Sequence, residues 1–322
     1  MSHELEMVGK DAQMAYVGDV PWHGLGVKVP ADLTPQQMAK SAGVDWNVET
    51  IPAHVEINGK QVEIGKSALV RSTDKKILDV ISNDWNPCQN VDAFEFFNDF
   101  ISAGDMEMHT AGSLKDGKIV WALAKVKDSS FELFNGKDRV DSYLHFTNPH
   151  QYGQSIDVRF TPIRVVCNNT LSLSLGMKSK NMVKISHRAQ FNADEVKLAL
   201  GVAADKLKTY KESAMFLSEK RYTNESMENY FKRVFPYMSS DPKKATELSR
   251  NAKLASEDYL TGQAGAELGE GTYWQLFNTV TYMTDHVMGR TADNRLSSAW
   301  YGSNRNLKVR ALETALEMAN EA

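Results

Sequence analysis

The sequence AHVEINGKQVEIGKSALVRS, residues 53–72, alternates apolar and polar side chains on both sides of Asn58-Gly59. Asparagine and glycine both tolerate the positive φ angles of a type I′ turn, and such a pair between two alternating runs is the strongest short signal for a β-hairpin. The run KKILDVIS, residues 75–82, predicts a further short strand. We therefore expect the fold to begin with antiparallel β structure.

The following segments predict one helix and then four more strands. In NVDAFEFFNDFIS, residues 90–102, we expect Asn90 or Asp92 as the cap, and apolar side chains recur at helical spacing: Val91, Phe94, Phe97, Phe100 and Ile101. Residues 106–126 predict two strands joined around Asp116-Gly117, and residues 140–166 predict two more around a Pro/Gly loop. The predicted order is hairpin, helix, antiparallel strands.

From about residue 190 the apolar period changes from two to about 3.6, which is typical of helices. Residues 192–222 predict one long helix with Asn192 as its N-cap, because no proline interrupts the pattern. Further helices are expected at residues 225–235, 241–260, 272–288 and 306–319, with a Gly-rich loop from Thr261 to Gly271. We predict an α+β fold, with an antiparallel sheet and a packed central helix in residues 1–190 and a helical region in residues 191–322.

The composition is that of an ordinary globular protein: 322 residues, 42% hydrophobic and 24% charged, with a formal net charge of −4. No apolar run reaches the length of a membrane span, and the first residues lack the basic-then-apolar order of a secretory signal. We therefore expect a cytoplasmic protein that does not bind membranes. Cys88 and Cys167 lie far apart and have no histidine-rich neighbours, which favours reduced thiols over a disulfide or a zinc site.

Residues 158–193 contain no aspartate or glutamate, and we call them the acid-free segment. With 41 acidic residues in a chain of 322, about four or five would be expected in a stretch of this length. The segment holds these basic side chains: Arg159, Arg164, Lys178, Lys180, Lys184, His187 and Arg188. A cationic segment in a chain of net negative charge predicts a polyanionic partner.

Two parts of the acid-free segment suit phosphate groups. A strand that ends at Val166 would lead into Asn168, which can cap a short helix beside Arg164, and a helix N-terminus next to a guanidinium binds phosphate. Residues 183–188 alternate between two strand faces: Lys184, Ser186 and Arg188 on one, Val183, Ile185 and His187 on the other. Structural interpretations stay open, in which Arg164 pairs with a carboxylate and residues 183–188 form an ordinary solvated strand.

Residues 285–311 carry a second group of basic and aromatic side chains: Arg290, Arg295, Arg305, Lys308 and Arg310 with Trp300 and Tyr301. Basic groups interleaved with aromatic rings hold single-stranded nucleic acid without sequence preference. Arg305 and Lys308 are therefore candidate contacts, unless this group pairs with acidic residues of the preceding helices or of another subunit. Trp22 and His23 have the same chemistry, with anchoring of the N-terminal arm as the alternative.

No pattern in the sequence indicates an enzyme or a cofactor. The GLG of residues 24–26 does not extend to GxGxxG or GxxxxGK[ST], and no GxSxG frames a nucleophilic serine. Asp84, Asp92 and Asp99 are not grouped with histidine at a metal-ligand spacing. We expect no catalytic residue, metal or cofactor, while carboxylates that converge in space would leave a metal-dependent nuclease as an alternative.

Four motifs carry a resemblance to a known family: VPWHGLG at residues 20–26, RSTDKKILDVISNDWNPCQN at 71–90, HTAGSLKDGKIVWALAKV at 109–126 and FTPIRVVCNNTL at 160–171. Together they resemble the phage- and plasmid-like family, whose members contain a domain of unknown function and occur in bacteriophages, prophages and plasmids. The resemblance covers almost the whole chain. It implies a mobile genetic element and a role in DNA recombination, replication or defence within the host cytoplasm.

The predicted order of elements also resembles that of the single-strand annealing proteins, the RecT and lambda Beta group. This resemblance implies a non-catalytic homo-oligomer, a ring or filament, that holds single-stranded DNA by its phosphates in a basic groove. We predict such binding and annealing, with contacts from Arg159, Arg164, Asn168, Lys178, Lys180, Lys184, Arg188, Arg305 and Lys308. The alternative is an interaction protein that engages or inhibits a phage or host nuclease or a defence complex.

Overall fold

The computed structural model describes residues 5–19, 21, 24–164, 169–170, 182–187, 191–237, 247–289 and 293–321. Contacts divide the chain into two compact units, each made of several segments. Unit 1 comprises residues 1–128, 143–160 and 182–203, and unit 2 comprises residues 129–142, 161–181 and 204–322. This division differs from the predicted single boundary after residue 190.

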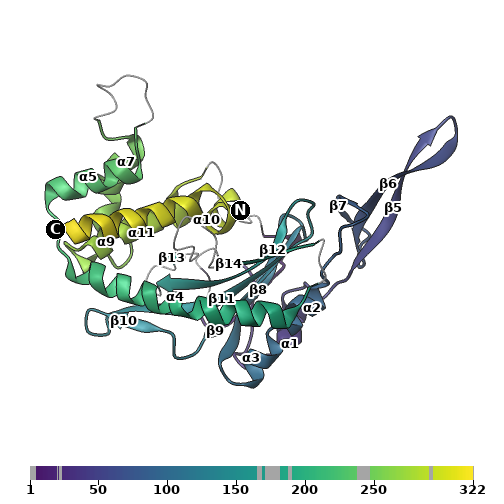
Figure 1. The fold of residues 1–322 in the computed structure, drawn as a ribbon, viewed down its shortest axis with the longest axis horizontal. Helices are drawn as coiled ribbons and strands as arrows, with labels where there is room; N and C mark the ends of the chain where they lie inside the picture. The colour runs from purple at the N-terminus through teal and green to yellow at the C-terminus, as the bar shows by residue number, and fades with distance from the viewer. Residues whose placement is uncertain are drawn as a thin grey trace. The chain divides into compact units, whose positions relative to one another are not determined.

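The fold is α+β, as predicted, with a mostly antiparallel sheet and a helical C-terminal region (Figure 1). The strands are β1 (Met7–Val8), β2 (Asp11–Ala12), β3 (Met14–Tyr16), β4 (Val27–Lys28), β5 (Val48–Ile57), β6 (Lys60–Arg71), β7 (Ile77–Ser82), β8 (Met106–Leu114), β9 (Ile119–Val126), β10 (Phe131–Leu133), β11 (Asp138–Pro149), β12 (Ser155–Arg164), β13 (Asn169–Thr170) and β14 (Met182–Ser186). The helices are α1 (Pro35–Ser41), α2 (Asn90–Glu95), α3 (Asn98–Ser102), α4 (Ala193–Glu219), α5 (Asn224–Val234), α7 (Arg250–Leu254), α8 (Leu260–Gly262), α9 (Tyr273–Tyr282), α10 (Asp293–Tyr301) and α11 (Ser303–Glu321).

The largest sheet has nine strands, in the order β13-β12-β11-β9-β8-β3-β4, with β10 paired to β11 and β14 paired to β12. The two predicted strand pairs are confirmed. Strands β8 and β9 join around Asp116 and Gly117, which both have positive φ angles, and β11 and β12 flank the Pro/Gly loop. Strand β4 pairs in parallel with β3.

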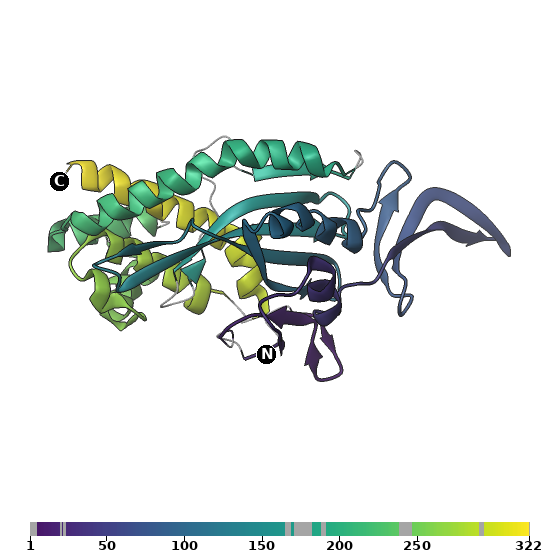
Figure 2. The ribbon, with the colours of Figure 1, turned by 90° about the horizontal axis from the view of Figure 1, so that it is seen from below.

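The predicted hairpin is confirmed as β5 and β6, and β7 completes a three-stranded sheet. Its turn residues Asn58 and Gly59 have φ angles of 52° and 76°, which suit a type I′ turn. Figures 1 and 2 show the hairpin extending away from strands β8 and β9 of the same unit. Every residue from 54 to 66 is exposed, so the outer half of the hairpin is a two-stranded ribbon without a core of its own.

The helix predicted at residues 90–102 is divided into α2 and α3. Its N-cap is Gln89 rather than Asn90 or Asp92, and Val91, expected on the buried face, is 43% exposed. Phe96 and Phe97 are both buried, with ring centroids 5.4 and 6.1 Å from that of Phe146 on β11. A regular helix would turn these adjacent side chains about 100° apart. The break at Phe96 and Phe97 therefore accompanies the packing of both rings on β11.

Unit 2 is built around α9, in which every residue from Tyr273 to Thr281 is buried. Helix α11 packs against α9, and α5 packs against α11 (Figure 1). Tyr230 of α5 donates a hydrogen bond to the carbonyl of Ala311 in α11, with 3.1 Å between the atoms. Trp274 Nε1 donates to Asp138 Oδ2 at 2.9 Å, so the first residue of β11 is tied to α9. The buried side chains of Tyr230 and Trp274 thus find hydrogen-bond partners within the unit.

Most of the predicted helices are confirmed. Asn192 caps α4, because its side-chain oxygen accepts from the backbone N–H of Asp194 at 3.0 Å. Residues 272–288 form α9 and a π-helical turn at Met283–Val287, and residues 306–319 lie in α11. Of residues 241–260, the structure describes those from 247, with α7 followed by a π-helical turn at Ala255–Tyr259. Among the residues described, no helix is long and apolar enough to cross a membrane.

Candidate nucleic-acid interface

The pairing of β12 with β14 places part of the acid-free segment on one face of the sheet. Lys184 of β14 lies opposite Asp157 of β12, and Met182 lies opposite Arg159. Side chains directly opposite each other, or two positions apart on one strand, share a face. One face of the sheet in unit 1 therefore carries Asp157, Arg159 and Lys184. The carboxylate of Asp157, the residue just before the acid-free segment, lies on the same face as two of the segment's cations.

Arg159 does not lie on the surface as the phosphate-contact prediction requires. Its side chain is 1% exposed, and its Nε atom is 2.8 Å from Asp157 Oδ1. A buried guanidinium needs a counter-charge, because removing it from water is costly. The prediction for Arg159 is therefore corrected: this residue forms a buried ion pair within the sheet, and we leave it out of the proposed DNA contacts.

A buried histidine lies close to this pair. His145 on β11 is 1% exposed, and its pKa is held well below the ordinary value by burial and, to a smaller extent, by the positive charge of Arg159. A neutral imidazole beside a guanidinium adds no second positive charge to the interior. The buried cation on this face, Arg159, is therefore compensated by Asp157, and His145 adds no further charge beside it.

Lys184 is exposed, as the alternation of residues 183–188 predicts. Ser186 is also exposed, Val183 and Ile185 are half-buried, and His187 is buried. The His187 ring stacks on Trp85, with centroids 4.0 Å apart, and its Nδ1 lies 3.1 Å from the carbonyl oxygen of Asn86. Burial lowers the pKa of His187. The stacking on Trp85 holds the chain at the end of β14, while Lys184 faces solvent.

The structure describes only part of the remaining predicted contacts. Arg164 is the last residue of β12, where its backbone pairs with Asn169 of β13 in unit 2, and its side chain lies outside the description. Asn168, Lys178, Lys180 and Arg188 lie outside the described residues, as do Trp22, His23 and Arg290. Lys184 is therefore the predicted contact of the acid-free segment that the structure places at the surface.

Of the predicted C-terminal contacts, Lys308 lies in the core of unit 2. Its side chain is 0% exposed, and its Nζ is 2.7 Å from Asp285 Oδ1. The alternative interpretation, pairing with an acidic residue of the preceding helices, therefore describes Lys308 correctly, and the contact prediction is corrected. Arg305 is half-buried. Trp300 is 4% exposed, so its ring does not offer a surface on which bases can stack.

A buried polar network lies where β11 ends and α2 begins. Asn90 Oδ1 accepts from Asn148 Nδ2 at 3.1 Å and is 2.9 Å from His150 Nε2. Asn90 Nδ2 donates to the carbonyl of Trp46 at 3.2 Å, so its side chain joins β11 to the segment before β5 instead of capping the helix. Within the described part of the chain, no group of three or more His, Cys, Asp or Glu residues could hold a metal ion.

Some residues of these sites were missed from the sequence although a signal existed. Asp157 precedes Arg159 by two positions, so strand alternation alone would have placed them together. Asp285 falls within the apolar helix of residues 272–288, where a buried carboxylate requires a cationic partner. Its partner Lys308 is 23 residues away, and only the fold identifies it.

The comparison with family models then places the chain. A model described as a domain of unknown function, DUF932, matches residues 77–300, which is more than half of the sequence. The chain belongs to the DUF932 family. The match begins at the first residue of β7 and ends within α10, so the β5–β6 hairpin precedes the matched region. No curated protein and no solved structure matches the chain.

Proposed function

We propose that this DUF932 protein binds single-stranded DNA by its phosphates and promotes annealing of complementary strands, without catalytic residues. The observation that carries the proposal is the acid-free segment, which presents Lys184 to solvent on β14. Because Arg159 is excluded, the proposed phosphate contacts of this segment are Arg164, Lys178, Lys180, Lys184 and Arg188, with Asn168 as a helix cap. Neutralisation of phosphates releases counterions, which supplies most of the affinity for a nucleic-acid backbone.

The context proposed for this activity is a phage or plasmid, acting in DNA recombination within a host cell. This part rests on the four sequence motifs of the phage- and plasmid-like family. Arg305, which is half-buried, stays a proposed secondary contact.

The proposed assembly is a homo-oligomer, a ring or filament. It is supported by the outer half of the β5–β6 hairpin, where Val55 lies opposite Val62 and Ile57 lies opposite Lys60. The exposed fractions of these apolar residues are 40% for Val55, 43% for Val62 and 53% for Ile57. Apolar side chains that gather on one exposed face mark a surface for association.

The experiment compares two lysines on the same sheet. Lys184 of β14 and Lys28 of β4, the strand at the other end of the sheet, are both exposed. For Lys184→Ala we expect weaker binding of a single-stranded oligonucleotide, and a slope of log affinity against log salt that is shallower by about 0.7, the value of one phosphate contact. Lys28→Ala should leave affinity and slope unchanged, and equal effects of the two substitutions would contradict the proposed placement.

A second candidate function is that of an interaction protein that engages a nuclease or a defence complex. The exposed apolar face of the hairpin favours it, because such a face also suits a protein partner. Capture from host lysate after nuclease treatment separates the two candidates. An association mediated by nucleic acid disappears after treatment, whereas a direct protein contact remains.

A further inference from the structure

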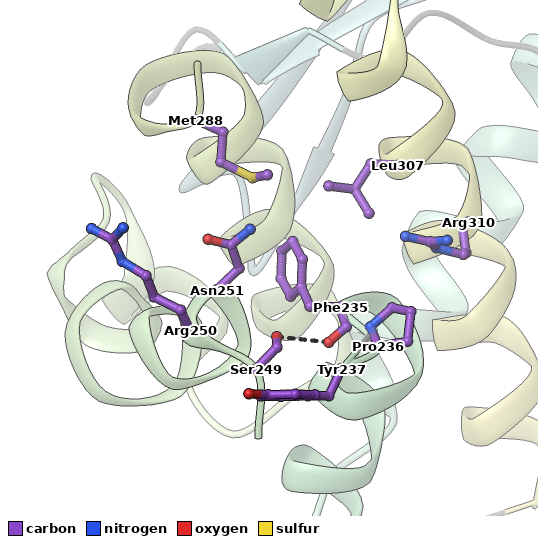
Figure 3. A pocket seen from close by; sticks show the side chains of 9 residues that line it. All are labelled: Phe235, Pro236, Tyr237, Ser249, Arg250, Asn251, Met288, Leu307 and Arg310. Carbon is purple, nitrogen blue, oxygen red and sulfur yellow. Dashed lines mark hydrogen bonds between the residues drawn. The ribbon is translucent and has the colours of Figure 1, made fainter. Parts of the chain in front are cut away.

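A pocket in unit 2 lies where α5 ends, next to the start of α7 and the first half of α11 (Figure 3). Its volume is about 630 Å³. Ligand sites for small molecules measure roughly 300–1,000 Å³. The pocket is kept open on one side by a hydrogen bond from Ser249 Oγ to the carbonyl of Phe235, at 2.7 Å, which fixes the two chain segments relative to each other.

The floor of the pocket is apolar. Phe235 is 5% exposed and Leu307 is 9% exposed, and Met288 lies beside them (Figure 3). The ring of Tyr237, 37% exposed, lies at the rim. The exposed ring of Tyr237, beside an apolar floor, provides stacking surface for a planar ring.

Two guanidinium groups lie on opposite sides of this floor, those of Arg250 and Arg310 (Figure 3). Arg310 Nη2 donates to the carbonyl of Val234 at 2.6 Å, which holds the group in place and leaves further N–H donors. Among the residues described, none of those lining the pocket is acidic. A guanidinium held in place in this way, as that of Arg310 is, binds phosphate in a bidentate manner.

We infer that this pocket binds a nucleoside phosphate, with the base on the ring of Tyr237 beside the apolar floor and the phosphate at Arg250 or Arg310. The amide of Asn251, which also lines the pocket, can donate to or accept from an edge of the base. The ligand is either a free nucleotide or the terminal nucleotide of a strand, because the two share this chemistry. The inference does not rest on the proposed annealing function, which concerns other residues.

Isothermal titration calorimetry of the full chain tests the inference, with deoxyadenosine 5′-monophosphate, deoxyadenosine and inorganic phosphate as separate probes. The monophosphate should bind more tightly than deoxyadenosine, which lacks the phosphate, and more tightly than inorganic phosphate, which lacks the base. Of the two variants Arg250→Ala and Arg310→Gln, the one that removes the guanidinium at the phosphate should weaken binding of the monophosphate about tenfold, the usual effect of one charge-assisted hydrogen bond, and the other should change it little. Glutamine at position 310 retains a donor for the carbonyl of Val234.

The matched control is Arg233→Ala on α5, an exposed arginine that pairs with Glu317 and does not line the pocket. It should bind the monophosphate like the unchanged protein, and thermal melting should show all variants folded. No heat with any probe, or equal binding by all variants, would overturn the inference. A 5′-phosphorylated oligonucleotide that binds more tightly than the same strand without phosphate would identify a strand end as the source, and equal binding with a tight monophosphate would identify a free nucleotide.

The result is separable from the proposed function. If the pocket binds the monophosphate while Lys184→Ala has no effect on long single strands, the annealing proposal fails alone. If the pocket does not bind while the salt dependence follows Lys184, the inference fails alone.

Discussion

At the scale of single residues, the corrected predictions concern charges whose partners lie inside the protein. Arg159 is compensated by Asp157, and Lys308 by Asp285. A basic residue in a sequence predicts a surface charge, because lysine and arginine are seldom fully buried. That expectation fails where a buried carboxylate forms an ion pair with the basic side chain. Asp157 could have been identified from strand alternation, whereas Asp285 becomes a neighbour of Lys308 only through the packing of α11.

Lys308→Ala should lower the free energy of unfolding by about 3–5 kcal/mol, because it leaves Asp285 buried without this counter-charge. Chemical denaturation measures the change. The exposed Lys253, on α7, is the control, and its alanine variant should change stability by less than about 0.5 kcal/mol. A double variant, Lys308→Met with Asp285→Leu, should recover most of the loss. Equal stabilities of Lys308→Ala and Lys253→Ala would show that the pair is not buried.

His150 predicts a dependence of stability on pH. Its pKa is lowered to about 3, mainly by burial and to a smaller extent by the charge of His187. An unfolded histidine has a pKa of about 6.5, so on acidification the unfolded chain takes up the proton first. The contribution of neutral His150 to the free energy of unfolding is therefore complete above about pH 6.5. It is lost as the pH falls toward about 3, at up to about 1.4 kcal/mol per pH unit.

Urea denaturation between about pH 7 and about pH 5 measures this slope. His150→Gln should make stability less dependent on pH in that range, because the amide does not titrate and can still donate to Asn90. The unchanged protein supplies the reference slope, to which the carboxylates also contribute. An identical slope in both proteins would mean that His150 is not held neutral by burial.

At the scale of elements, local signals were sufficient where neighbours in sequence are neighbours in space. The Asn58-Gly59 turn, the alternation around Lys184 and the Asn192 cap are of this kind, and the structure confirms them. The helix predicted at residues 90–102 was divided because Phe96 and Phe97 both pack on Phe146, a residue about fifty positions away. The sequence predicts the β5–β6 hairpin too, but not that Val55, Ile57 and Val62 on one of its faces are exposed.

The hairpin gives a test of the proposed homo-oligomer. Val55 and Val62 lie on one face, and their neighbours Glu56 and Gln61 form a pair on the other. Val55→Lys with Val62→Lys should weaken self-association at least about tenfold, because apolar contact area is replaced by charge. Glu56→Lys with Gln61→Lys adds charge to the opposite face and should have little effect. Sedimentation velocity over a range of concentrations measures both.

If both hairpin variants associate like the unchanged protein, the apolar face is not the contact between copies. If both lose association equally, net charge rather than the apolar face is responsible. Thermal melting separates either result from a general loss of stability, since the substituted side chains are exposed.

At the scale of the whole molecule, antiparallel strands followed by helices could be predicted because the apolar period changes near residue 190. The division into two units could not, because each unit gathers segments from distant parts of the chain. The pocket of unit 2 has the same character. Phe235, Arg250 and Arg310 come from three separate segments, and no local pattern joins them. Sites made by such packing are accessible only from the structure.

The central claim is that the acid-free segment holds single-stranded DNA by its phosphates. Its most direct test is the affinity for a single-stranded oligonucleotide measured from about 50 mM to about 200 mM salt. With about five phosphate contacts, the affinity of the unchanged protein should fall roughly a hundredfold over this range, and the variant Arg164→Ala, Lys184→Ala, Arg188→Ala should bind more weakly with a shallower slope. Equal affinity and equal slope in the two proteins would contradict the claim.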